Sequence, residues 1–94
     1  MGAMNKLFNS AVRVKILALL YGMECCEFGY LKERLKLTDG NLEHHLNKLE
    51  NYELITQKKT VIRNKLKTEV KITKKGKDEF KNYLEEILRL SKSE

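Results

Sequence analysis

Residues 35–52, L-K-L-T-D-G-N-L-E-H-H-L-N-K-L-E-N-Y, constrain the fold of this chain more than any other stretch. Leu42, Leu46 and Leu49 recur at positions i, i+4 and i+7, the spacing of one apolar stripe along an α-helix. Thr38 precedes the stripe, and its hydroxyl can accept a hydrogen bond from a free backbone N–H of the first helical turn. We therefore expect a short helix that must bury its leucines against another element, since a helix of this length is not stable alone.

The opposite face of this helix, predicted over residues 39–51, carries small, amide and imidazole side chains. At 100° per residue from Leu42, five positions fall at roughly 140–240°, away from the leucines: Gly40, His44, Asn47, Lys48 and Asn51. Such groups suit hydrogen bonding to base edges in the DNA major groove. The stretch is therefore interpreted as a recognition helix. His45 falls beside the stripe and is expected to be packed and half-buried, and for His44 plain solvent exposure stays open as an alternative.

Two helices are expected before this one. Residues 11–21 (A-V-R-V-K-I-L-A-L-L-Y) are apolar on nearly every side, which is typical of a helix at the centre of its domain, and Gly22 is suited to be its C-cap. Residues 23–28 form a connector with room for one short strand. A second, short helix is indicated by apolar residues three and four apart: Phe28, Leu31 and Leu35. Two short helices joined by a tight turn, the second with polar groups outward, have the helix-turn-helix pattern.

A β-hairpin is expected next. Residues 54–62 lose the helical period and gain β-branched side chains, and residues 68–73 alternate apolar with polar positions. The residues between them, 63–66 (R-N-K-L), are predicted to form the tip, where Asn64 can adopt a positive φ. Thr73 can then cap a last helix over residues 74–90, which has a full apolar stripe: Phe80, Tyr83, Leu84, Ile87 and Leu88.

These elements predict a mainly α fold with a small β-hairpin, in which a three-helix core carries a wing of two or three strands. We expect one domain over residues 5–90, because 94 residues suffice for one modest core. Residues 1–4 can be read as a remnant added before a native start at Met4, outside the expected domain.

The positive charge is concentrated in the hairpin region. Residues 53–77 carry nine lysines and arginines against two carboxylates, a net of +7, whereas the whole chain has a net charge of +6. A basic patch of this kind points to a polyanion, with nucleic acid first. The alternative is a solvated edge strand that uses lysine to oppose aggregation. No apolar run approaches the roughly 18 residues of a membrane span, so we expect no membrane contact and a cytoplasmic protein.

The two cysteines, Cys25 and Cys26, are adjacent. Neighbouring cysteines rarely bridge each other and nothing indicates secretion, so reduced thiols are expected. A metal site lacks ligands, because the chain has no C-x-x-C and its two histidines are also adjacent, about 100° apart on a helix. No Ser/His/Asp set or phosphate-cradling glycine loop is present. We therefore expect no enzyme, no metal and no cofactor.

Three segments together resemble the prokaryotic winged helix-turn-helix transcriptional regulators: V-R-V-K-I-L-A-L-L-Y, then F-G-Y-L-K-E-R-L-K-L-T-D-G-N-L-E-H-H-L-N-K-L-E-N-Y-E-L-I, then V-K-I-T-K-K-G-K-D-E-F. Within these the chain is most similar to small MarR-like and ArsR-like repressors, many of them archaeal, and the likeness covers residues 7–90. The resemblance implies a homodimer with recognition helices in successive major grooves of double-stranded DNA and wings at the flanking minor grooves.

The chain also departs from this family's pattern. Glu43 stands where these proteins often have a small residue, and a carboxylate repels phosphate unless it accepts from a cytosine amino group. The tip R-N-K-L lacks the Gly and Pro often found in wings. The C-x-C box of the metal-sensing members falls on Glu27 and Gly29, so Cys25 and Cys26 do not match it.

The leading hypothesis is a dimeric, sequence-specific regulator of transcription, read as a repressor on a palindromic operator. Its recognition helix is 39–51 and its wing 58–67, and the expected DNA-binding residues are Thr38, Gly40, Asn41, His44, Asn47, Lys48, Lys58, Lys59, Arg63, Asn64, Lys65 and Lys67. The apolar residues of both terminal segments exceed what one small core needs, so we expect a homodimer interface from Leu7, Phe8, Phe80, Tyr83, Leu84, Ile87 and Leu88. The alternative is a winged-helix protein-interaction module within a larger assembly.

Overall fold

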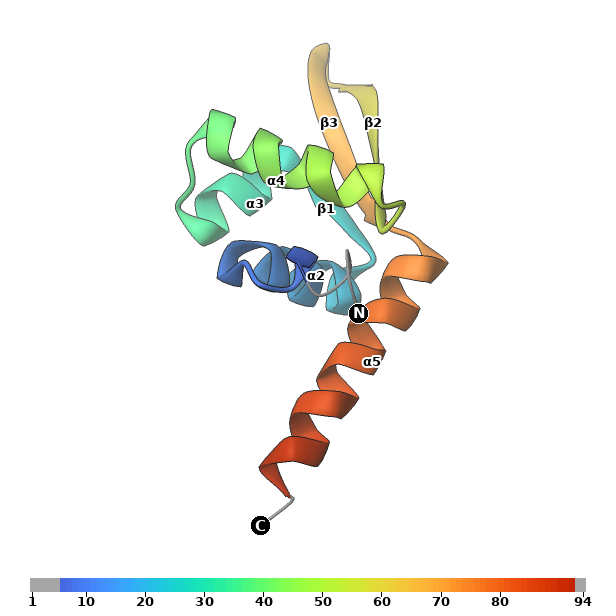
Figure 1. Ribbon diagram of the computed structural model, residues 1–94. Coiled ribbons are helices and arrows are strands. Elements are labelled where there is room, and N and C mark those ends of the chain that lie inside the picture. Colours follow the sequence, from blue (N-terminus) through green and yellow to red (C-terminus); the bar gives the residue numbers. More distant parts are fainter. Residues whose placement is uncertain (1–5, 93–94) are drawn as a thin grey trace.

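The computed structural model describes residues 6–92, so the interpretation of residues 1–4 lies outside the part of the chain described. After a helical turn at Lys6 and Leu7, the described residues form four helices and three strands (Figure 1). Their arrangement confirms the predicted winged helix fold. The elements are α2 (Ala11–Met23), β1 (Cys25–Glu27), α3 (Phe28–Leu35), α4 (Asp39–Asn51), β2 (Ile55–Ile62), β3 (Lys65–Ile72) and α5 (Lys74–Ser91).

Helix α2 lies at the centre of the core, as its sequence predicts. Ile16, Leu17 and Leu20 are fully buried. The predicted end at Gly22 was wrong, because the helix continues to Met23 and Glu24 is the C-cap. Glu24 adopts a φ of 76° and donates its N–H to the Leu20 carbonyl. Tertiary contacts hold this unfavourable backbone: the Glu24 carbonyl accepts from Ile72 of β3, and its carboxylate pairs with Lys77 of α5.

Helices α3 and α4 form the predicted helix-turn-helix. Lys36 ends α3 in the left-handed conformation, with φ 55°, and Leu37 donates its N–H to the Lys32 carbonyl. Thr38 then caps α4, since its Oγ1 accepts from the Asn41 N–H at 3.1 Å. The stripe that the sequence indicates is completely buried in α4: Leu42, Leu46 and Leu49.

The sheet has three antiparallel strands in the order β1-β3-β2. The connector at residues 23–28 does contain one short strand, β1, which pairs with β3. The predicted four-residue tip was wrong, because β3 already begins at Lys65 and the turn contains only Arg63 and Asn64. Both turn residues have positive φ, 52° and 64°, as a two-residue turn of type I′ requires. The paired strands of the wing therefore extend further, and its turn is shorter, than the sequence suggests.

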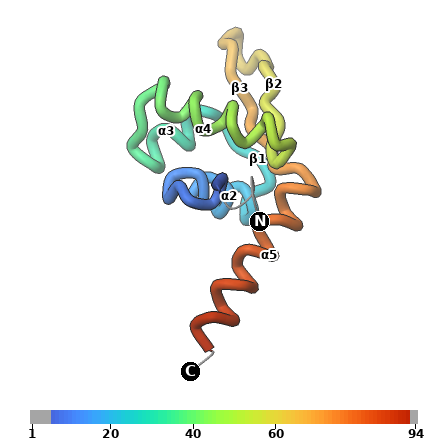
Figure 2. Tube along the Cα trace, in the orientation of Figure 1, coloured from blue at the N-terminus to red at the C-terminus, as the bar shows by residue number. Residues whose placement is uncertain are grey.

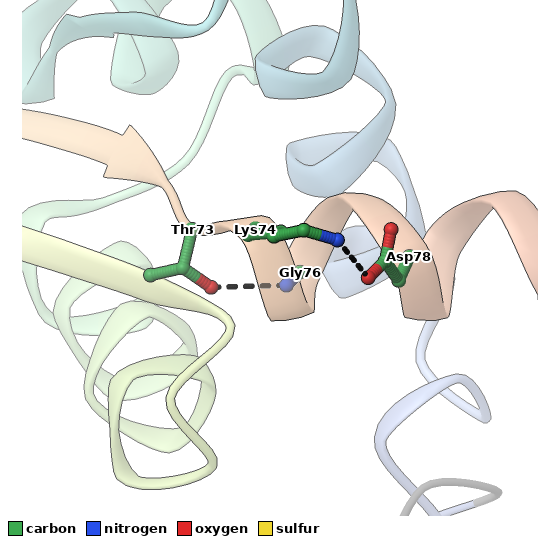
Figure 3. A network of polar contacts seen from close by, with 4 residues as sticks. All are labelled: Thr73, Lys74, Gly76 and Asp78. Carbon is green, nitrogen blue, oxygen red and sulfur yellow. Dashed lines mark hydrogen bonds and ion pairs between the residues drawn. The ribbon is translucent and has the colours of Figure 1, made fainter.

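Helix α5 begins against the body and then projects away from it (Figures 1 and 2). Thr73 caps it through the Gly76 N–H at 2.9 Å, and Lys74 pairs with Asp78 within the first turn (Figure 3). Gly76 is buried against Leu54, where a Cβ would lie 2.1 Å from the Leu54 carbonyl oxygen. Glycine is thus required for α5 to approach the α4–β2 loop this closely.

Some apolar residues of the two terminal segments are buried within the chain itself. Leu7 and Phe80 are each only 2% exposed, and Phe8 stacks on Tyr83 with ring centroids 4.5 Å apart. The expectation that the apolar residues of both terminal segments exceed what the core needs was wrong for Leu7 and Phe80, because the start of α5 and the turn at Lys6 and Leu7 complete the core. Leu7 and Phe80 are thus covered within the chain, whereas Phe8 and Tyr83 stay partly exposed.

Candidate nucleic-acid interface

The outward face of α4 presents the polar groups that the sequence predicts for it. Gly40, Asn41, His44, Asn47 and Lys48 are all exposed. Helix α4 and the wing lie at one end of the molecule and the free end of α5 at the other (Figure 1). Thr38 is exposed at the start of α4, but its hydroxyl oxygen already accepts from the helix backbone. This end of the molecule is therefore an open surface rich in hydrogen-bonding side chains.

Asn47 is held in place by a residue that sequence reasoning missed. Gln57 of β2 donates from Nε2 to Asn47 Oδ1 at 3.0 Å and to Glu50 Oε1 at 2.9 Å. The Gln57 backbone N–H also donates to Glu50 Oε2 at 3.1 Å. A signal existed in the strand alternation, because Gln57 is two positions from the buried Ile55 and so faces α4. The amide of Asn47 is therefore preorganised by the wing.

His45 points away from this surface, toward α2. Its Nδ1 lies 3.1 Å from Arg13 Nη1, and its ring is half-buried, as the sequence indicates. Burial of the ring and the nearby Arg13 guanidinium lower the pKa of His45 below its usual value. The neutral His45 ring and its bond to Arg13 therefore hold this side of α4 against α2 and the core.

The wing supplies the cations. Lys58, Lys59, Arg63, Asn64 and Lys65 are exposed, and Lys67 lies 3.9 Å from Glu27 of β1 with a partly exposed side chain. Residues 54–68 contain five lysines and arginines and no carboxylate. Because the strands are antiparallel and the turn is tight, these charges gather around one narrow projection.

A groove separates α4 from the wing. Two adjoining hollows, of about 300 and 230 Å³, share Phe28, Glu43 and Thr68 in their walls. Glu43 thus faces the wing side of α4 rather than its outermost face. Asp39, also on this wall, pairs with Lys32 of α3 at 2.9 Å. Two of the three carboxylates of α4 therefore line the groove, and the third, Glu50, bonds to Gln57 of β2.

The cysteines lie on β1 and are free and half-buried. Burial, together with neighbouring Cys25 and Glu27, raises the pKa of the Cys26 thiol to about 11. A thiol with such a pKa is almost entirely protonated at neutral pH and is a poor nucleophile. Among residues 6–92, no group of three or more potential metal ligands comes together. In the same part of the chain, no helix is long and apolar enough to span a bilayer.

Comparison with known proteins gives this surface its context. The family described as "Winged helix DNA-binding domain" matches residues 12–90. An uncharacterized protein of Methanocaldococcus jannaschii is 66% identical over 88 residues, which cover 94% of this chain and 96% of that protein.

Two solved structures are similar to it. A transcriptional regulator homologue from Pyrococcus horikoshii OT3 has a TM-score of 0.79 and 28% identity, covering 96% of this chain and 94% of that one. NadR in complex with 4-hydroxyphenylacetate has a TM-score of 0.74 and 18% identity over 89% of this chain and 62% of that one, a likeness of fold alone. The chain belongs to the winged helix DNA-binding domain family.

Proposed function

We propose that this winged helix DNA-binding domain is a sequence-specific regulator of transcription, a repressor of the MarR-like and ArsR-like kind that acts as a cytoplasmic, non-catalytic homodimer. The observation that carries the proposal is the pairing of two surfaces at one end of the molecule. Helix α4 offers neutral hydrogen-bonding groups, and the adjoining wing offers five cations without a carboxylate. Hydrogen-bonding groups are what binding to base edges requires, and cations are what binding to phosphates requires.

In this proposal residues 5–90 act as one domain, and α4 enters the major groove with Gly40, Asn41, His44 and Asn47 toward the bases. An asparagine amide can bind both N6 and N7 of adenine. Phosphates are held by Lys48, Lys58, Lys59, Lys65 and Lys67, and the turn at Arg63 and Asn64 reaches the flanking minor groove. The Arg63 guanidinium suits the minor groove, because the negative potential of that groove is strongest where the groove is narrow.

The homodimer is proposed to form through the projecting part of α5. Leu84, Ile87 and Leu88 are 37%, 43% and 57% exposed on a helix that leaves the body. Clustered apolar side chains of this size on an isolated helix favour association. A two-fold dimer would place two α4 helices on a palindromic operator. The similar Pyrococcus horikoshii protein is a transcriptional regulator homologue, which supports a role in transcription for this chain.

The experiment is a selection of genomic fragments with the purified protein, followed by footprinting and a salt titration. We expect a shared palindrome. If two wings neutralise roughly 6–10 phosphates, affinity should fall about 10³–10⁵-fold between about 50 and 200 mM salt. Replacing Arg63 and Lys65 by alanine should lower the slope of log K against log salt by about two per chain. A nearly flat salt response by the wild type would contradict the proposal.

A matched control removes the same charge from another place. Lys81 and Lys92 are exposed on and just after α5, far along the sequence from the wing. Replacing both by alanine changes the net charge as much as the wing variant does. We expect the control to retain the wild-type slope, because those lysines lie away from the α4 surface.

The second candidate is a winged-helix protein-interaction module in a larger assembly. It is favoured by one observation, the exposed apolar side chains near the wing tip, since such residues also occur at protein interfaces. If the Arg63 and Lys65 variant bound duplex as well as the wild type did, and no duplex raised the melting temperature, this candidate would replace the first.

A further inference from the structure

One side of the wing ends in a pair of exposed apolar residues. From the body to the tip, the residues of β2 and β3 that pair on this side are Ile55 with Ile72, Gln57 with Val70, Lys59 with Thr68, and Val61 with Leu66. Directly paired residues of an antiparallel hairpin point to the same side, and successive pairs alternate. Gln57 on this side bonds to Asn47 and Glu50, so it is the side that faces α4. Val61 and Leu66 therefore face the groove between α4 and the wing, at its outer end.

The Val61–Leu66 pair has no role in the core of the chain. Each of the two side chains is 67% exposed, whereas Val70 and Ile72 of the same side are at most 2% exposed. The hollow beside α4 is lined by Leu66 together with Phe28 and Glu43, so the pair continues one wall of the groove outward. Ile62, on the opposite side of the wing, is less exposed, at 41%, and is paired with Lys65.

The charges around the Val61–Leu66 pair indicate which kind of partner surface the pair can bind. Lys59 precedes it on the same side of β2, and the turn places Arg63 beyond it. Lys65 and Lys67 are the neighbours of Leu66 along β3 and extend from the opposite side of the narrow wing. A small apolar centre on a wing edged by cations matches a partner with apolar walls between rows of negative charge. The DNA minor groove has this character, with sugar CH groups as walls and phosphates along both rims.

We propose that the Val61–Leu66 pair packs against the deoxyribose wall of the minor groove while the neighbouring cations hold the phosphates on either side. This proposal rests on the proposed function, because it assumes that α4 and the wing bind the same duplex. The pair faces α4, so a duplex held by α4 would bring its adjacent minor groove to this side of the wing. An anionic membrane offers similar chemistry but no partner for the polar face of α4.

The test replaces both residues by threonine, a β-branched residue that is favourable in strands, and it changes no charge. Binding is measured by fluorescence anisotropy on an A·T-rich duplex of roughly 30 base pairs, long enough for two half-sites. We expect Val61→Thr with Leu66→Thr to weaken binding by about tenfold or more. The salt slope should equal that of the wild type, since no phosphate contact is lost. Ile62→Thr, on the opposite side of the wing, is the matched control and should bind within about twofold of the wild type.

A minor-groove ligand tests the location of the contact. On a duplex saturated with netropsin, the wild type and the threonine double variant should bind equally weakly, because the groove that distinguishes them is filled. If the difference persists there, the pair contacts some other surface and the proposal is overturned. Thermal melting of both variants establishes that the wing remains folded.

The remaining outcomes separate this proposal from the proposed function. If the wild type binds duplex with a steep salt dependence and the double variant binds equally well, the apolar contact is overturned and the regulator reading stands. If the wild type binds no duplex, both fail. If vesicles of phosphatidylserine and phosphatidylcholine bind the wild type but not the double variant, and duplex affinity is unchanged, the pair is a membrane contact instead.

Discussion

Arg13 of α2 and His45 of α4 are joined side chain to side chain, with Nη1 3.1 Å from Nδ1. The same guanidinium donates from Nε to the Leu7 carbonyl at 3.0 Å and from Nη2 to the Lys6 carbonyl at 3.2 Å. Because arginine is a donor only, Nδ1 must accept, and the imidazole is neutral with its proton on Nε2. One side chain thus ties the first turn of the chain and α2 to the recognition helix.

This link predicts a loss of stability in acid that is specific to His45. The folded state lowers the pKa of His45 below its ordinary value of 6.5, chiefly through burial and then through Arg13. The unfolded chain therefore binds the proton more readily, so the contribution is fully present above pH 6.5 and is lost as the pH falls through the folded-state pKa. Chemical denaturation at a series of pH values should show this fall in the free energy of unfolding.

The variant His45→Asn should reduce that pH dependence, because an asparagine oxygen can accept from Arg13 without titrating. The matched control is His44→Asn, which alters an exposed ring and leaves the bond between Arg13 and His45 intact. The control should retain the fall. Equal pH dependence in the wild type and in His45→Asn would show that the histidine does not titrate as argued.

Much of the fold was predictable because local signals and tertiary packing agree. Thr38 and Thr73 were identified as caps from sequence, and both accept the expected backbone N–H in the structure. Side chains that pack across distant segments gave no such signal. Nothing in the spacing of Leu7 and Phe80 distinguishes a stripe covered by its own chain from one covered by a second copy, and the structure buries both internally.

The candidate surface was predictable to the same extent. The periodicity of α4 identified which residues are exposed, since that depends only on the buried leucines. It did not identify Gln57, whose bonds to Asn47 and Glu50 require the strand to lie beside the helix. The positive φ of Arg63 was also missed, because the turn length is set by the register of two whole strands rather than by the four residues at the tip.

Gly76→Ala should be among the most destabilising single changes in this chain. The added Cβ would lie 2.1 Å from the Leu54 carbonyl oxygen and 2.8 Å from Ile72 Cγ1, and the backbone atom cannot move without shifting the loop after α4. Overpacking of this kind costs about 1–3 kcal/mol or more. Urea denaturation measures the loss. Gly22→Ala, within α2 and with open space around it, should instead be neutral or slightly stabilising.

Gln57→Ala should broaden base preference without a large loss of affinity. Its amide donates to Asn47 Oδ1 and Glu50 Oε1, so the truncation frees the Asn47 side chain to rotate. Removing these two bonds costs about 0.5–1.5 kcal/mol of stability. Under the proposed function, affinities for operator duplexes with single base-pair changes should differ less from one another than they do for the wild type. Gln57→Glu, which repels Glu50, should perturb the same positions, and unchanged discrimination in both variants would remove Gln57 from the recognition surface.

Exposed apolar residues on the outer half of α5 predict a dimer that two charges should dissociate. Leu84 and Leu88 are 37% and 57% exposed in the single chain, so glutamates there do not disturb its core. In a dimer each buried leucine contributes roughly 1.5–3 kcal/mol, and the substitution would also bury a carboxylate. Leu84→Glu with Leu88→Glu should therefore sediment as a monomer with unchanged helical circular dichroism and little affinity for a two-fold operator.

The control for this last experiment changes the charge by the same amount on the polar side of the helix. Asn82→Glu with Arg89→Gln also lowers the net charge by two, and both side chains are exposed and lie roughly 100–160° around α5 from Leu84 and Leu88. This variant should remain a dimer. If the wild type itself sediments as a monomer at micromolar concentration, α5 does not dimerise. Binding by α4 and one wing would then have to supply the whole affinity for DNA, and a palindromic operator would no longer be expected.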